Sequence, residues 1–459
     1  MSAFSRRTML GRSALAGLAA ITPYSASANA AAVAAADDDS RWKHEYDYGH
    51  RMLFMDEYLT GTKSILGCIA GETGHISDLA DRAVSVIKNG GTVWNNANIG
   101  HMPSSEQRED RRGNPGVMKT HTKRADFQNQ AEMGEADFSD LTPGDMIFTC
   151  YCNRSLKEAR DRGVYVVCVP VNYVNNEFYP EGYVLPNEDN LMLGDVSNEV
   201  LHSYIPFEQG LVHAPEIPYM AICPSCVTAL GALYWMLSAE ILNRLTDKNA
   251  VPGEKAALYH ATLTERIEMV DGHRRRIRET AVEMAHRIID GGRWFVRSVE
   301  NTGFQGELVR VASGPWMPNT GDWNANKLRN VYLVAGMSPA YPDEVAAALE
   351  KQREGAFVIG IAPSSMDGVV PSGRLIDVAD VGFDSFSPEY GGVLTFKGRE
   401  GTFCPTSGIV GNVIQQMICA QWADEMARRG EIPNFLLGNY RGGRRFNPLL
   451  QPMAAARGY

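Results

Sequence analysis

Polar and ionisable side chains gather in short loops that follow apolar runs, and three of these residues are of types suited to proton transfer. His101 ends the loop Asn95–His101, where an imidazole can exchange a proton with a sugar hydroxyl or carbonyl. Glu208, in IPFEQG, and Glu389, in SPEYGG, occupy matching places in two similar stretches. The sequence therefore predicts His101 as a catalytic acid/base, with a carboxylate such as Glu208. Two alternatives stay open: a surface histidine, and glutamates that share only a loop conformation.

Hydroxyl groups in matching loops are of the right type to hold a ligand. Cys223-Pro224-Ser225 and Cys404-Pro405-Thr406 each stand directly before a long apolar run typical of a buried helix. Free backbone N–H groups at a helix start favour an anion or a hydroxyl there, although Ser and Thr also cap helices without any ligand. The expected ligand-binding residues are Asn98, Ser155, Ser225, Thr228, Ser338, Thr406, Ser407 and Arg441.

Eight cysteines raise the question of thiol or metal chemistry. Cys223-Pro-Ser-Cys226 is the only CxxC in the sequence, and a helix start lowers the pKa of a thiol. The second stretch carries Ser407 at the matching position, so one sulfur is lost while the pattern remains. A zinc site would also need Cys150 and Cys152. We therefore expect the cysteines to serve packing, and we predict no metal and no cofactor.

The elements that would position these loops occur twice. The stretches that begin at Asp195 and Asp380 each contain Asp-Val, a polar loop, a short β-like run, Cys-Pro-[Ser/Thr] and a long apolar helix. Upstream of each stretch, a helix ends in Gly-Gly and is followed by a short strand and a polar loop, at 78–101 and at 280–303. An internal repeat of this length determines the architecture, and here it predicts two tandem copies.

The apolar runs between the loops indicate the fold class. Met146–Thr149, Val164–Val169 and Val331–Ala335 are continuously apolar rather than alternating, and helical segments separate them. Such strands form parallel sheets covered by helices on both faces. Ligands of these sheets bind beyond the carboxyl ends of the strands, where the polar loops lie. We predict an α/β protein of two doubly wound domains.

Composition changes along the chain suggest the domain boundaries. We expect a signal peptide at 1–36, an N-terminal helix at 37–74, a first α/β domain at 75–245, a linker and helix at 246–276, a second α/β domain at 277–430, and an irregular C-terminal tail at 431–459.

The N-terminus has the features of an export signal. Ser5-Arg6-Arg7-Thr8-Met9-Leu10 is a twin-arginine pattern, followed by an Ala/Leu/Gly-rich core and by Ala28-Asn29-Ala30 as a cleavage site. The alternative is a disordered, Ala-rich start. We expect a periplasmic or secreted protein. A formal net charge of -10 disfavours a nucleic-acid partner, and we expect no membrane span after the signal.

Together these motifs resemble the SIS (sugar isomerase) domain family, and within it an uncharacterised phosphosugar-binding branch. The resemblance is carried by Ile99-Gly100-His101-Met102, by Cys404-Pro405-Thr406-Ser407, and by the segment Ile432–Gly443. It covers nearly all of the chain after the signal as two tandem copies, with the best match over 380–459 and a poor one in the first loop of the second copy. The resemblance implies two flavodoxin-like domains that form a pseudo-dimer, with ligand sites at the seam.

The resemblance also implies a function in carbohydrate chemistry. Members of the family carry out aldose–ketose isomerisation, ether or amine chemistry on sugar phosphates, or sensing of a phosphosugar. Here the Ser/Thr-rich phosphate loop of the family is replaced by Cys150–Ser155 and Gly336–Pro339, which lack most of its hydroxyls. We therefore expect an unphosphorylated sugar or sugar acid, and an isomerase or a related enolising enzyme. The alternative is a non-catalytic sugar-binding module, and a homo-oligomer is left open.

Overall fold

The structure is a computed structural model of the chain. It describes residues 52–97, 106–109, 111–123, 136–171, 191–207, 209–300, 302–309, 311–318, 328–364, 373–388, 392–438, 442–457 and 459. The described compact unit runs from Phe54 to Tyr459. The expected signal peptide at 1–36 lies outside the described residues.

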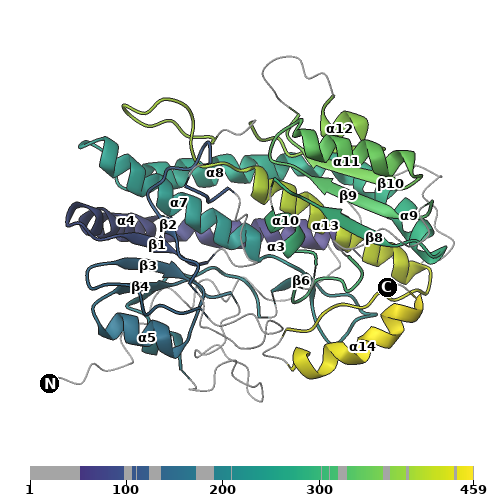
Figure 1. Ribbon diagram of the computed structural model, residues 1–459, viewed down its shortest axis with the longest axis horizontal. Coiled ribbons are helices and arrows are strands. Elements are labelled where there is room, and N and C mark those ends of the chain that lie inside the picture. Colours follow the sequence, from purple (N-terminus) through teal and green to yellow (C-terminus); the bar gives the residue numbers. More distant parts are fainter. Residues whose placement is uncertain are drawn as a thin grey trace. The chain divides into compact units, whose positions relative to one another are not determined.

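The first half of this unit, residues 54–253, alternates helices and strands (Figure 1). Its elements are α3 (Phe54–Ile69), η2 (Ala70–Glu72), α4 (Thr73–Lys88), β1 (Val93–Asn95), β2 (Lys119–Thr120), β3 (Met146–Thr149), α5 (Arg154–Asp161), β4 (Tyr165–Cys168), α6 (Leu193–Val196), β5 (Glu199–Val200), β6 (Gly210–Val212), β7 (Ile222–Pro224) and α7 (Cys226–Thr246).

Among the described residues, the second half, 254–459, follows much of this succession, but it has no counterparts of β2, β6 and β7 and adds α10 and α14. Its elements are α8 (Glu254–Met269), η3 (Val270–His273), α9 (Arg274–Ile289), β8 (Trp294–Arg297), α10 (Thr302–Gly306), β9 (Val331–Ala335), α11 (Pro342–Arg353), β10 (Phe357–Ala362), α12 (Leu375–Val378), β11 (Val381–Asp384), α13 (Ser407–Arg428) and α14 (Gly443–Arg457).

Nine of the described strands form two parallel sheets, one in each half, and β6 and β7 form a separate antiparallel pair. The first has the order β2-β1-β3-β4-β5 and the second the order β11-β10-β9-β8. Without β2, the two orders correspond strand by strand. Figure 1 shows α4 and α5 on opposite sides of the first sheet, and α11 and α13 on opposite sides of the second. The predicted α/β class, with helices on both faces of parallel sheets, is confirmed.

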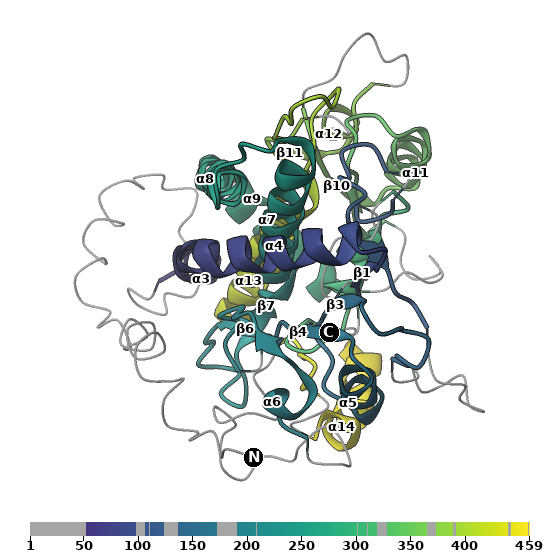
Figure 2. The same ribbon diagram turned by 90° about the vertical axis from the view of Figure 1, so that its left-hand side faces the viewer.

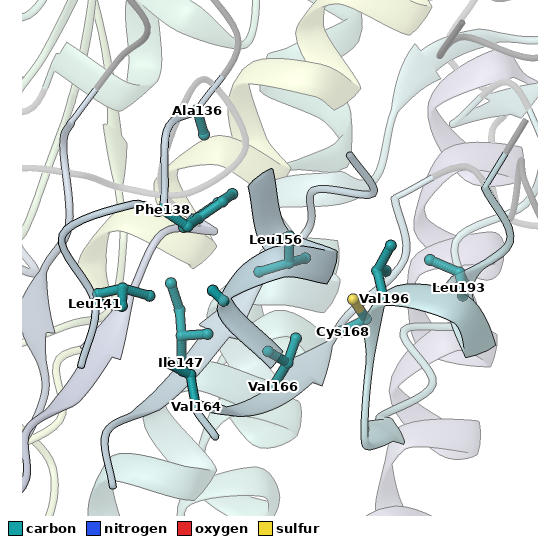
Figure 3. Packing of buried hydrophobic residues seen from close by; sticks show 11 residues of the cluster. Ala136, Phe138, Leu141, Ile147, Leu156, Val164, Val166, Cys168, Leu193 and Val196 are labelled. Carbon is teal, nitrogen blue, oxygen red and sulfur yellow. The ribbon is translucent and has the colours of Figure 1, made fainter. Parts of the chain in front are cut away.

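Continuous apolarity explains why these strands are central. All four residues of β3 and all six of β10 are buried. Under the first sheet, a cluster joins strands β3 and β4 to α5 and α6 through side chains such as Ile147, Leu156 and Val196 (Figure 3). Removing these apolar surfaces from water is the main source of stability of such a layer.

The long helix that follows the strands of each half is buried: α7 from Cys226 to Asn243, and α13 from Ser407 to Arg428. α7 and α13 pack against each other, and each also contacts the first helix of the opposite half: α3 packs against α13, and α8 against α7. Figure 2 shows α3 and α4 nearly in line across α7 and α13. Among the described residues, α7 is the one helix long and apolar enough to span a membrane, and its apolar window is buried inside the protein.

Two details of the backbone are shared by the halves. Cys223 and Cys404 both adopt positive φ angles, 64° and 61°, which non-glycine residues rarely take. The hydroxyl of Tyr58 in α3 donates to Pro224 O at 3.1 Å, and that of Tyr259 in α8 donates to Pro405 O at 2.8 Å. The predicted Cys-Pro-[Ser/Thr] entrances are therefore built alike.

The C-terminal segment differs from the prediction. The tail was expected to be irregular, but residues Gly443–Arg457 form α14, with Pro448 and Pro452 inside it. Prolines usually end helices because they lack the N–H group. Just inside this helix, the Asn447 side chain accepts from Leu437 N and donates to Leu437 O, both at 2.9 Å, and so ties α14 to the preceding strand-like segment.

Candidate functional site

The structure places most of the predicted hydroxyl residues at helix starts, and most of these hydroxyls have a partner inside the protein. Ser225, buried before α7, donates to Gln209 O at 3.0 Å. Thr406, buried before α13, shares a hydrogen bond of 2.9 Å with Ser387. Thr228 lies in the first turn of α7 and is fully buried, and its Oγ1 has no partner within the part of the chain that the structure describes.

Ser155 lies in the first turn of α5, at the first sheet. Its Oγ accepts from Phe138 N at 2.8 Å and donates to Asp137 at 3.2 Å. Asn153 caps the same helix by accepting from Leu156 N. Ser155 therefore fastens the segment before β3, and its hydrogen bonds to described residues include none of the other predicted binding residues.

Four predicted residues, Asn98, His101, Glu208 and Arg441, lie outside the described residues. Their assignments remain predictions.

Ser407 leads to a residue that the sequence analysis did not single out, Glu106. The Oε1 atom of Glu106 accepts from Ser407 Oγ at 2.5 Å and from Gly408 N at 2.7 Å, at the start of α13. Glu106 follows β1 in the first half, whereas α13 belongs to the second, so the contact joins the two halves. The side chain is almost fully buried, and its Oε2 atom has no partner among the residues described.

Burial decides the protonation of this carboxyl group. Removal from water raises the pKa of Glu106 to about 7, and the hydrogen bonds from Ser407 and Gly408 and the nearby Arg111 charge oppose the rise. A carboxyl group with a pKa near neutrality can both accept and return a proton at pH 7. Its unpartnered Oε2 is the atom available for that exchange.

Glu307 occupies the corresponding place in the second half. It is fully buried, and its Oε2 accepts from Cys226 Sγ at 3.2 Å, at the start of α7 in the first half. Burial raises the pKa of Glu307 to about 8. Its Oε1 has no partner within the described ranges. Each half thus contributes one buried glutamate to the helix start of the other.

The loops that carry these glutamates are fastened to the opposite half in the same way. Cys404 N donates to Gly113 O, and Cys223 N donates to Ser313 O, both at 2.8 Å. Gly113 and Ser313 share a positive φ. In the first loop, Asn114 also donates to Glu106 O at 3.2 Å. The seam between the halves therefore holds both carboxyl groups in defined positions.

Next to Glu106 lies an ion-paired group that contains Ser338, another predicted residue. Ser338 follows β9, and its Oγ donates to both carboxylate oxygens of Glu300, at 2.9 and 3.0 Å. Arg111 from the first half donates to Glu300 at 3.0 Å. Glu300 in turn contributes to raising the pKa of Glu106. Ser338 and Ser407 thus lie in one region. Ser338 bonds Glu300 and Ser407 bonds Glu106, and Arg111 interacts with both glutamates.

The buried face of α13 adds further polar atoms. Gln415 donates to Phe304 O at 2.9 Å and Gln416 to Glu307 O at 2.8 Å, which fixes the segment around α10. The Oε1 atoms of both glutamines and the Nδ2 atom of Asn412 have no partner among described residues. Buried polar atoms are normally satisfied by protein, water or ligand.

The cysteines contribute less to this region than the CxxC pattern suggested. Cys168, Cys223, Cys404 and Cys419 are buried thiols. Burial raises the pKa of Cys226 as well as of Cys223, which is opposite to the lowering that nucleophilic thiols need. No group of three His, Cys, Asp or Glu side chains is arranged to hold a metal within the described part of the chain.

A surface hollow of about 540 Å³ lies elsewhere. It is lined by α4 residues, including Asp81 and Arg82, together with Gly144 and Glu199. Gly144 lies two residues before β3, so the hollow belongs to the amino-terminal edge of the first sheet. Ligands of parallel sheets bind at the opposite edge, and the hollow includes none of the residues at the seam.

Glu106 and Glu307 escaped the sequence analysis because each is a single glutamate in a polar loop. One signal was present: both stand 15 residues after the second glycine of the Gly-Gly helix ends, Gly91 and Gly292. Extending the repeat through the first loops would have paired them.

Part of the chain is similar in sequence to curated UPF0309 proteins. No family model matches the sequence. The chain is 32% identical over 124 residues to a UPF0309 protein of Geobacillus thermodenitrificans, covering 26% of this chain and 50% of that protein. It is also 32% identical over 141 residues to a UPF0309 protein of Halalkalibacterium halodurans, covering 29% and 55%. The chain thus spans about half the length of the curated relatives it matches.

Solved structures with some likeness carry names from sugar metabolism. One is a putative phosphosugar isomerase from Silicibacter pomeroyi, at 10% identity and a TM-score of 0.43, covering 83% of this chain and 100% of that one. Another is tagatose-6-phosphate ketose/aldose isomerase from Escherichia coli, at 10% identity and a TM-score of 0.40, covering 83% and 95%. The parallel sheets with helices on both faces, established by strand pairing, are the fold that the SIS resemblance implied.

Proposed function

We propose that the chain is a tandem SIS protein that binds a sugar or sugar derivative at the seam and acts on it as an aldose–ketose isomerase. The observation that carries the proposal is Glu106, a buried carboxyl group with a pKa of about 7 and one unpartnered oxygen. It lies beyond the carboxyl end of β1 and at the N-terminus of α13, where an α/β sheet receives its ligand.

In this proposal Glu106 moves the proton that interconverts the two sugars. Ser407 and Gly408 hold Oε1, and Oε2 faces the substrate. Oε2 removes the proton from C2 of the aldose, and the electron pair forms the C1–C2 double bond of the enediolate. The same oxygen returns the proton to C1, which gives the ketose, while a second group moves the proton between O1 and O2. No net oxidant or reductant is consumed.

His101 is the proposed second group. It stands five residues before Glu106 in the chain, and an imidazole can pass a proton between neighbouring oxygens. Glu208 keeps its predicted place as a further carboxylate, and Asn98 and Arg441 keep theirs as ligand-binding residues. The twin-arginine pattern at Ser5–Leu10 supports action outside the cytoplasm.

The second candidate function is a non-catalytic module that binds a carbohydrate derivative. The sparse hydroxyls of the loops at 150–155 and 336–339 favour it. Such a module would bind a sugar at the seam without exchanging any carbon-bound proton.

Solvent isotope exchange separates the two candidates. Sugars that raise the melting temperature of the protein are incubated with it in D₂O, and deuterium at C2 is measured by NMR. We expect incorporation by the wild type, and a loss of about 10²–10⁴-fold in Glu106→Gln, the range for removal of a general base. Glu307→Gln, at the corresponding place in the other half, should retain exchange. No deuterium in any sugar that binds tightly would exclude the isomerase.

A further inference from the structure

Glu300 is held in an unusual position at the ligand edge of the second sheet. Its Oε2 atom accepts from Met337 N at 2.8 Å and from Ser338 N at 2.9 Å, and Ser338 Oγ donates to both of its oxygens. Arg111, from the first half of the chain, donates to Oε1 at 3.0 Å. The side chain of Glu300 is fully buried.

These donors together make an anion site. Two successive backbone N–H groups, a hydroxyl and a guanidinium converge on one point directly after β9, beyond its carboxyl end. Such convergence binds phosphate or carboxylate groups in many proteins. Here the anion is a carboxylate of the chain itself. The loop closes tightly around it, because a Cβ atom on Gly336 would lie 3.3 Å from Glu300 Oε2.

We infer that Glu300 is a specificity-determining residue: it fills this anion site, so that the seam beside Glu106 accepts uncharged ligands and rejects phosphorylated ones. The charges support the inference. Arg111 already pairs with Glu300, and Glu300 and Glu106 interact electrostatically. A phosphate group in the loop would have to displace one carboxylate and would face the other. Repulsion between like charges in a buried site is strong because little water screens it.

That the ligand is a sugar rests on the proposed function. That Glu300 keeps phosphate out of the loop does not depend on it. The exclusion of phosphate from the loop can be measured without any sugar. A chain that exchanges no deuterium with sugars would overturn the isomerase and leave the phosphate result standing.

The test uses inorganic phosphate as the probe, with sodium chloride at matched ionic strength as the reference. Binding is followed by calorimetry and by the melting temperature for the wild type, Glu300→Ala and Glu300→Gln. We expect no saturable binding by the wild type and a gain of about tenfold or more in Glu300→Ala. Glu300→Gln should fall between them, because the amide still occupies the loop while the charge is gone. Adding Ser338→Ala to Glu300→Ala should remove the gained affinity.

Two results would overturn the inference. The first is saturable phosphate binding by the wild type that Ser338→Ala abolishes, which would show that the loop is open to anions. The second is a folded Glu300→Ala protein with no more affinity for phosphate than the wild type. Should that variant not fold, the isosteric Glu300→Gln replaces it, and the absence of any gain there counts against the inference in the same way.

Discussion

Glu106 and Glu307 take corresponding places in the two halves of the chain, but the groups around them differ. Glu106 is held by a hydroxyl and a backbone N–H, with Arg111 nearby, and burial raises its pKa to about 7. Glu307 is held by the thiol of Cys226, a weak donor, and burial raises its pKa to about 8.

The comparison shows which features the two halves share and in which they differ. The backbone frame is common: each half has a cysteine of positive φ before its long buried helix, and a tyrosine of the first helix in the same half donates to the proline that follows that cysteine. The groups that hold the carboxyls are not common, because Ser407 beside Glu106 corresponds to Cys226 beside Glu307. A poorer set of donors leaves the carboxyl group of Glu307 easier to protonate, and for this reason we assign the proposed proton transfer to Glu106.

The largest effect on the free energy of unfolding should come from replacing Glu106 or Glu307 with glutamine, measured at alkaline pH. The folded-state pKa of each glutamate lies above its ordinary value of 4.5. The stabilisation from the protonated form is therefore present below pH 4.5 and is lost as the pH rises through about 7 for Glu106 and about 8 for Glu307. Glu106→Gln and Glu307→Gln stay neutral, so we expect each to exceed the wild type at pH 9 by on the order of 1–3 kcal/mol.

Urea unfolding at pH 5 and pH 9 measures this effect. The exposed Glu265 of α8 gives the matched control, since Glu265→Gln also removes one negative charge. A gain at pH 9 that Glu265→Gln reproduces would be a general charge effect and would contradict the account of the two buried glutamates.

A smaller and equal effect is expected from the two tyrosine hydroxyls. Tyr58→Phe and Tyr259→Phe each leave a buried proline carbonyl without its donor, Pro224 O in one half and Pro405 O in the other. The loss of such a bond costs about 1 kcal/mol. Thermal unfolding of both variants, with half-buried Tyr341→Phe as control, should show similar losses. If one variant loses clearly more stability than the other, the two tyrosine–proline contacts are not equivalent in the two halves.

Many of the strands and helices could be predicted from the sequence, because the signals that indicate them are local. Continuous apolar runs predicted the parallel strands, and the Cys-Pro-[Ser/Thr] strings predicted the starts of α7 and α13. The exception is α14, whose interior prolines are ordinarily signals of irregular structure.

The site was harder to predict, because its contacts cross the chain. Ser407 was foreseen as a binding residue, but its partner Glu106 lies 301 positions away. Glutamates are rarely buried, so a loop glutamate is ordinarily interpreted as solvated. Ser338 was foreseen for the ligand, and its actual partner is Glu300. Residue types and local spacing predicted which hydroxyls matter, whereas their partners depend on how the halves meet.

The protonation of Glu106 tests the central claim most directly, and it can be observed without a ligand. Infrared difference spectra of the wild type minus Glu106→Gln, recorded across a pH series, isolate the carbonyl band of this one carboxylic acid. The account predicts that the band persists at pH 6 and disappears with a midpoint near 7, as burial requires. A midpoint near 4.5, the ordinary value for glutamate, would show that Glu106 is exposed to water and would contradict the account.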